Sequence, residues 1–167
     1  LFLPFVHAFA SVLVGLLFRR HGGAEISSAR PAGLQGGKTF TAAFTGSVKS
    51  AFASTLNICG FIIFFTVFIR LLFLAGIIPF LARALTYLLS PFGMHVELAE
   101  QLLTGIIELS SGVSGLRGAA EQLSSGIAMA AFMLGWAGIS IHCQVLSFLC
   151  EAGVSARTYL LGKLLHG

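Results

Sequence analysis

Two polar, glycine-rich clusters interrupt the apolar sequence between Gly105 and Gln144. The first cluster begins at Gly105 and reads Gly-Ile-Ile-Glu-Leu-Ser-Ser-Gly-Val-Ser-Gly, and the second ends at Gln144 and reads Gly-Trp-Ala-Gly-Ile-Ser-Ile-His-Cys-Gln. A continuous transmembrane helix needs no such clusters, whereas a helix broken at membrane depth exposes backbone groups that must find a partner. A pair of glycine-interrupted apolar segments is typical of a transporter binding site.

The composition of the chain is that of a membrane protein. Of its 167 residues, 56% are hydrophobic and 10% are charged, whereas about 25% are charged in a typical soluble domain. The sixteen phenylalanines and twenty glycines are accompanied by no aspartate, and a soluble domain of this size could not bury so much apolar surface. We therefore expect an all-α polytopic protein of the lipid bilayer, with spanning helices, amphipathic interfacial helices and a hairpin of broken helices.

Three regions follow from the hydropathy pattern. Residues 1–20 are apolar and end at Arg19 and Arg20, which predicts a spanning helix with its basic end in the cytoplasm. Residues 21–38 are rich in glycine and serine and predict a cytoplasmic linker. Residues 39–167 predict the membrane domain. Because both chain ends look truncated, we interpret the chain as a fragment that lacks the N-terminal half of a longer protein.

The membrane domain is expected to begin with a helix on the bilayer surface. Within residues 39–54, an apolar residue recurs at every fourth position: Phe40, Phe44, Val48 and Phe52. This spacing predicts an amphipathic interfacial helix that leads into a span over residues 50–69. The alternative is that residues 39–54 are the extended start of that span. Pro79 predicts a break or kink before a short interfacial or re-entrant helix over residues 80–89.

The two glycine-rich clusters predict broken helices around residues 108–118 and 135–144. Half a span is expected over residues 96–109, followed by the first break at residues 110–118, which hold three glycines. Residues 122–150 are long enough to span and are interrupted at Gly135-Trp136-Ala137-Gly138.

Glu108 is the acidic residue within the apolar core of this hairpin. An intramembrane carboxylate is a candidate for function, here as a proton carrier, a sodium ligand or a group that orients a solute. Alternatively, Glu108 caps the broken helix by accepting backbone hydrogen bonds. Small and hydroxyl residues follow it: Ser110, Ser111, Gly112 and Ser114. Such residues allow a ligand to approach the backbone, or allow helices to pack closely.

The second cluster contributes three polar side chains after Gly138. Ser140, His142 and Gln144 occupy alternate positions, so in an extended segment they would point to one side. His142 can hold a proton near neutral pH, although a satisfied structural histidine is the alternative. Asn57 is expected to add an amide to the same cavity.

The sequence carries no signature of an enzyme or of a metal site. It contains no HExxH, GxSxG or P-loop motif, and its three cysteines lie in apolar stretches without metal-ligand spacing. Its basic residues flank apolar segments and do not form a basic patch with aromatic residues, so nucleic acid is not an expected partner. We expect a protein that is not an enzyme and that needs no cofactor or metal.

A family resemblance rests on the two glycine-rich clusters together with Asn57-Ile58-Cys59-Gly60 and Lys163-Leu164-Leu165-His166-Gly167. These segments resemble the second half of the YlbJ-type sporulation integral membrane proteins of the nucleoside-recognition, or Gate-domain, group, and the resemblance covers most of residues 39–167. It implies a carrier for dipicolinate, a small aromatic dianion, in the bacterial membrane around the forespore. Ser110 and Ser111 stand where some relatives have threonine and asparagine.

The implied substrate agrees with the candidate residues. Hydroxyl and amide groups and an aromatic wall suit a flat anion, and Trp136 would supply the wall. Because Glu108 would repel a dianion unless it is protonated or paired with a cation, coupling to H⁺ or Na⁺ through Glu108 is a hypothesis. The alternatives are a non-transporting scaffold of spore-envelope assembly and a Gate-type nucleoside or cation carrier. A fragment expressed alone is expected to be unstable or to form homo-oligomers, since its breaks lack their partner half.

Overall fold

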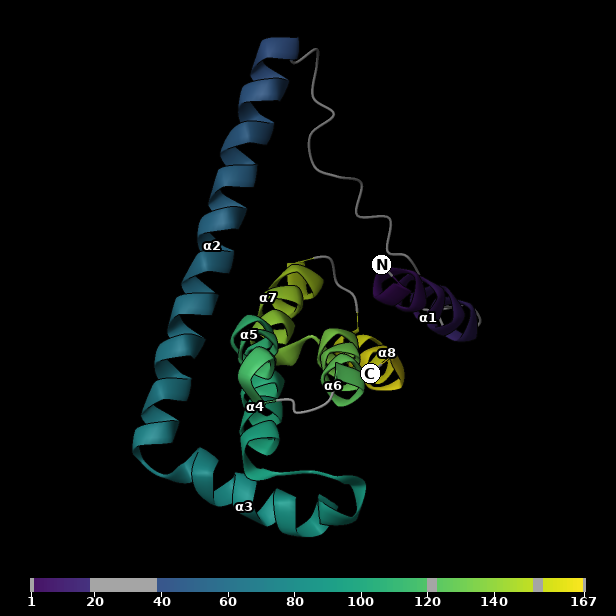
Figure 1. Cartoon of the computed structure of the whole chain (residues 1–167). Coiled ribbons are helices and arrows are strands. Elements are labelled where there is room, and N and C mark those ends of the chain that lie inside the picture. Colours follow the sequence, from purple (N-terminus) through teal and green to yellow (C-terminus); the bar gives the residue numbers. More distant parts are fainter. Residues whose placement is uncertain (1, 19–38, 120–122, 152–154, 167) are drawn as a thin grey trace.

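The computed structural model describes residues 2–18, 39–119, 123–151 and 155–166 (Figure 1). The linker predicted over residues 21–38 lies outside these residues. All regular elements in the described part are helices: α1 (Phe2–Phe18), α2 (Phe40–Leu74), α3 (Ile77–Leu89), the short 3-10 helix η1 (Ser90–Phe92), α4 (Val96–Ile107), α5 (Leu109–Ala119), α6 (Leu123–Trp136), α7 (Gly138–Glu151) and α8 (Ala156–His166). Helix α2 runs along one side of the molecule, and α4 to α8 form the cluster beside it (Figure 1).

Two stretches among the described residues are long and apolar enough to cross a membrane. They are α2 and Ser124–Cys150, which holds most of α6 and α7, and a third is added if the bent pair Ile77–Phe92 and Val96–Ile107 counts as one span. This confirms the all-α membrane architecture. Helix α1 has 17 residues, which is about 26 Å at 1.5 Å per residue and slightly less than the hydrocarbon core of about 30 Å. That residues 1–20 span the membrane therefore stays a prediction.

Helix α2 is a single helix of 35 residues, so the expectation of a separate surface helix over residues 39–54 was wrong. The extended start of the span is what the structure contains. Hydroxyl side chains do not interrupt the helix, because Thr45 and Thr55 donate to the carbonyls four residues earlier at 2.8 and 2.9 Å. At about 52 Å, α2 is longer than the hydrocarbon core is thick.

The turn after α2 forms at Gly76 and not at Pro79. Gly76 has a φ of 74°, which glycine adopts without the steric cost of a Cβ atom. Helix α3 then begins at Ile77, so Pro79 lies in the first turn, where its missing N–H group is not needed. The predicted short helix therefore starts earlier than expected. It lies across the ends of α2 and α4, and its axis, continued through η1, makes an angle of 114° with α4 (Figure 1).

The first helix break is one residue long. Glu108 is extended, with φ −139° and ψ 114°, and α5 begins directly after it. Residues 110–118, expected to form the break, are helical instead. Their glycines allow α5 to pack against α4, because a Cβ atom at Gly112 would overlap the backbone of Gly105. Such contact through small residues is common between membrane helices.

The second break occurs where the sequence predicts it, at Ala137 and Gly138. Both have a φ of 76°, a conformation that is unusual for alanine. Because α7 begins at Gly138, the expectation of an extended segment around Ser140, His142 and Gln144 was wrong, and all three are helical residues.

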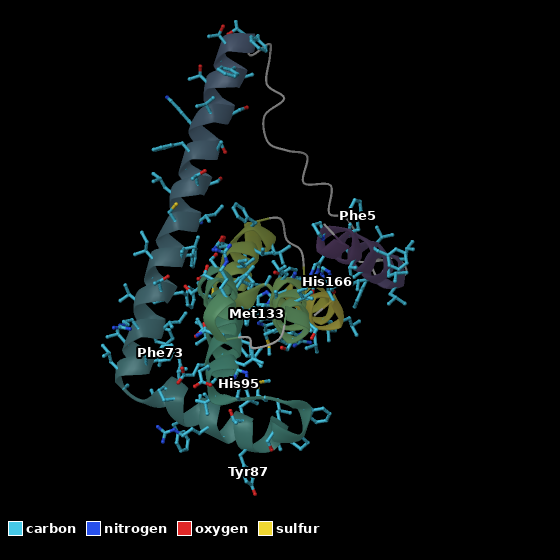
Figure 2. All side chains as sticks on the ribbon, viewed as in Figure 1. Phe5, Phe73, Tyr87, His95, Met133 and His166 are labelled. Carbon is cyan, nitrogen blue, oxygen red and sulfur yellow. The ribbon has the colours of Figure 1, made fainter. Side chains whose placement is uncertain are left out.

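The buried core lies where α4, α5 and α6 meet. Leu98, Leu116 and Met133 form its centre, and Figure 2 shows Met133 in the middle of the helix cluster. Much apolar surface stays exposed elsewhere, as for Phe5 at 73% and Phe80 at 71%. Exposed apolar surface of this extent is typical of a protein surrounded by lipid.

Gly112→Ala is expected to destabilise the protein, because its methyl group would force α4 away from α5 at a cost of about 1–3 kcal/mol. The control is Gly118→Ala in the same helix, where the space is open and alanine gains about 1 kcal/mol in helix propensity. Thermal unfolding in detergent measures both. A melting temperature for Gly112→Ala as high as that of the control would contradict the close contact.

Ala137→Gly is expected to leave the melting temperature unchanged or to raise it, because glycine relieves a left-handed conformation that costs alanine about 1–2 kcal/mol. The matched control is Ala131→Gly inside α6, which should lower stability by about 1 kcal/mol. Equal destabilisation by the two changes would show that α6 and α7 are not broken at residue 137.

Candidate functional site

The two helix breaks contact each other. A Cβ atom on Gly138 would lie 3.0 Å from the Gly105 carbonyl oxygen and 3.1 Å from the Leu109 amide nitrogen. Trp136 Nε1 donates a hydrogen bond to the Ile106 carbonyl oxygen at 3.4 Å. We call this contact between residues 105–109 and 136–138 the crossing. It joins the two glycine-rich clusters from which the site was predicted.

Two features of the crossing favour glycine at position 138. Its φ of 76° is costly for other residues, and a side chain would meet backbone atoms of the first break. The C-terminal end of α4 thereby lies against the N-terminal end of α7. The partial negative charge of the one helix end and the partial positive charge of the other attract each other.

Glu108 caps α5 from inside the break. Its side chain is 1% exposed, and its two carboxylate oxygens accept the N–H groups of Ser110 and Ser111 at 2.9 and 2.7 Å. These are two of the donors that the first turn of a helix leaves without an intrahelical acceptor, and a carboxylate suits the positive helix end. An anion that binds at the start of α5 would have to displace Glu108.

The hydroxyl and small residues after Glu108 do not all face the crossing. Ser110 and Ser114 are exposed, Ser111 is half-buried, and Gly112 is buried against α4. Their contribution is therefore mainly through the backbone N–H groups of Ser110 and Ser111 and through the packing of Gly112.

The three predicted polar residues of α7 are buried, but they point to two sides of the helix. Ser140 and Gln144 lie one turn apart and share a face, and the Gln144 side chain lies within hydrogen-bond distance of Ser140 Oγ, at 3.5 Å. His142 Nδ1 instead lies 3.0 Å from the Tyr159 hydroxyl of α8. The His142 ring also packs edge-on against Trp136, with the ring centroids 4.6 Å apart.

Asn57 is not brought to the crossing. It is exposed on α2, where it lines an open groove of about 420 Å³ with apolar residues of the same helix. The described residues that line this groove all belong to α2, so the structure does not place the Asn57 amide in a cavity with the two breaks, as the sequence analysis expected.

Two further polar residues near the site, one buried and one half-buried, were missed from the sequence. Thr104, which is 4% exposed, donates to the Glu100 carbonyl oxygen at 2.7 Å one turn before the break. Tyr159 contacts His142 across a separation of seventeen residues. No periodic pattern relates these two positions to the glycine-rich clusters.

In the described part of the chain, no group of His, Cys, Asp or Glu side chains could hold a metal ion.

Sequence comparison shows which family the chain belongs to. The model of the Gate family, described as nucleoside recognition, matches residues 55–152, which contain both breaks and more than half of the chain. The sporulation integral membrane protein YlbJ of Bacillus subtilis (strain 168) is 29% identical over 121 residues, which are 72% of this chain and 30% of that protein. No solved structure matches the chain significantly. The chain is thus a member of the Gate (nucleoside recognition) family and an integral membrane protein.

Proposed function

We propose that this chain is part of a membrane carrier for a small solute and is not an enzyme. The observation that carries this is the contact between two helix breaks in a domain with apolar spans. Breaks at membrane depth are tolerated where protein buries them or where they line a cavity, and discontinuous helices form the solute sites of secondary transporters. Buried Glu108, Ser140 and Gln144 lie at or next to the crossing, which is the proposed solute site.

The first candidate solute is dipicolinate, carried across the membrane around the forespore. Similarity to a sporulation integral membrane protein supports this choice. Because Glu108 would repel a dianion, its transport requires a proton or Na⁺ at Glu108. The small anion and the coupling ion are proposed to bind together for this reason.

A nucleoside is the second candidate. The Glu108 carboxylate already occupies the start of α5, so an uncharged solute with hydroxyl and amide groups binds at the crossing without electrostatic repulsion. The description of the matching family, nucleoside recognition, supports the same class.

The chain spans about 30% of its relative, and a carrier needs more than the spans described here. We propose that an N-terminal half of the same protein, or a second copy of the chain, completes the walls around the crossing. Exposed Ser110 and Ser114 on α5 would then face that partner.

Counterflow into proteoliposomes tests the proposed function. The purified protein is expected to exchange radiolabelled dipicolinate or uridine with an unlabelled internal pool, and excess of the unlabelled same solute should abolish the signal. Exchange of dipicolinate favours the anion, and exchange of uridine favours the nucleoside. Exchange of neither solute would contradict a carrier for these two classes and would favour the scaffold role.

Glu108→Gln is expected to remove the dependence of transport on the proton or sodium gradient, because the amide cannot ionise. It should also weaken the cap of α5, which such exchanges change by about 0.5–2 kcal/mol. The control is Glu97→Gln on the exposed first turn of α4, which should change neither property. Unchanged transport with unchanged pH and sodium dependence in Glu108→Gln would contradict coupling through this carboxylate.

A further inference from the structure

A second polar region lies between α1 and α8. An open cleft of about 390 Å³ is formed by α1, α7 and α8, and its polar lining residues are Ser11, Thr158, Tyr159, Lys163 and His166. We call it the α1–α8 cleft. Figure 2 shows His166 on the side of α8 that faces α1, and none of the described lining residues is acidic.

Lys163 is half-buried in this cleft. In the described part of the chain, no carboxylate lies within ion-pair distance of its amino group. Burial lowers the pKa of Lys163, because the ammonium group loses water without gaining an opposite charge. A group in this position gains free energy when an anion arrives.

One turn beyond Lys163, His166 of α8 lies next to His7 of α1. His166 Nε2 lies 3.3 Å from His7 Nδ1 of α1, and His7 Nε2 is buried without a hydrogen-bond partner among the described residues. The pKa of His166 is lowered by burial and further by the charge of Lys163 and by His7. The cleft thus gathers groups that donate hydrogen bonds or carry positive charge, from two helices that are far apart in the sequence.

Tyr159 connects this cleft with the crossing. Its hydroxyl lies 3.0 Å from His142 Nδ1, and burial raises the pKa of Tyr159, so it remains an O–H group at neutral pH. In the tautomer with the proton on Nδ1, His142 donates to the Tyr159 oxygen and leaves the hydroxyl hydrogen free for a ligand in the cleft. The ring of His142 in turn contacts Trp136.

We propose that the α1–α8 cleft binds the carboxylate or phosphate group of a small anion, with Lys163 as the charge partner and Tyr159 as a hydrogen-bond donor. An anionic oxygen supplies the counter-charge that the described lining residues lack, and charge-assisted hydrogen bonds are the stronger kind. A free anion and a lipid headgroup share this chemistry, and both are tested below. The site is distinct from the crossing, so binding there does not require that the protein transports a solute.

Isothermal titration of the protein in phosphatidylcholine nanodiscs tests this site with benzoate and inorganic phosphate, and with benzamide as the uncharged comparator. Nanodiscs that contain phosphatidylglycerol test the lipid source by competition with benzoate. We expect Lys163→Gln to weaken anion binding by about tenfold or more, and Lys163→Arg to retain most of the affinity because the charge is kept. The matched control is Arg157→Gln, which removes the same charge from an exposed position of α8.

Each result decides for or against the cleft. Binding of an anion, or of phosphatidylglycerol, that is lost in Lys163→Gln and kept in Lys163→Arg and Arg157→Gln supports it. Equal loss in Lys163→Gln and Arg157→Gln, equal binding of benzamide and benzoate, or no binding of any anion or anionic lipid overturns it. Because titration measures binding alone, these results are independent of the counterflow assay.

Discussion

The architecture of the membrane domain depends on one buried carboxylate. Glu108 is the only residue between α4 and α5, and it accepts the backbone N–H groups of Ser110 and Ser111. In an apolar surrounding, those donors would otherwise cost free energy without compensation. A single residue can therefore redirect the chain at this depth, and the redirected chain places the ends of α4 and α5 against the second break at Gly138. Close packing through Gly105 and Gly112 follows from the same geometry.

The sequence predicted the class of the protein and the second break, but it placed the first break after Glu108, in residues that are helical. Long uncharged runs and glycine clusters are local signals, so the membrane class and the break at Ala137–Gly138 could be read from them. The glycines after Glu108 serve helix packing and not a loop, which depends on the partner helix and leaves no local signal. Likewise, the sequence did not show that the turn forms at Gly76 and not at Pro79. The reason is that α3 starts at Ile77, which places Pro79 in its first turn.

The burial of several candidate residues, but not their directions, could be predicted from the sequence. Buried Glu108, Ser140, His142 and Gln144 were all identified from polarity within an apolar segment. Their directions were not, because Gln144 turns toward Ser140 while His142 turns toward Tyr159. Charge is thereby divided between two places: the crossing holds a carboxylate, and the α1–α8 cleft holds Lys163. For an anionic solute, attraction acts in the cleft and repulsion acts at the crossing, whereas an uncharged solute meets no net barrier at Glu108.

An experimental density map of the protein in a lipid nanodisc tests the central claim most directly. The contact between the breaks predicts an extended Glu108 whose carboxylate lies on the N–H groups of Ser110 and Ser111, with Gly138 packed against the backbone of Gly105 and Leu109. A map in which residues 96–119 form one unbroken helix, or in which Gly138 lies away from Glu108, would contradict it, because no crossing would then remain as the proposed solute site.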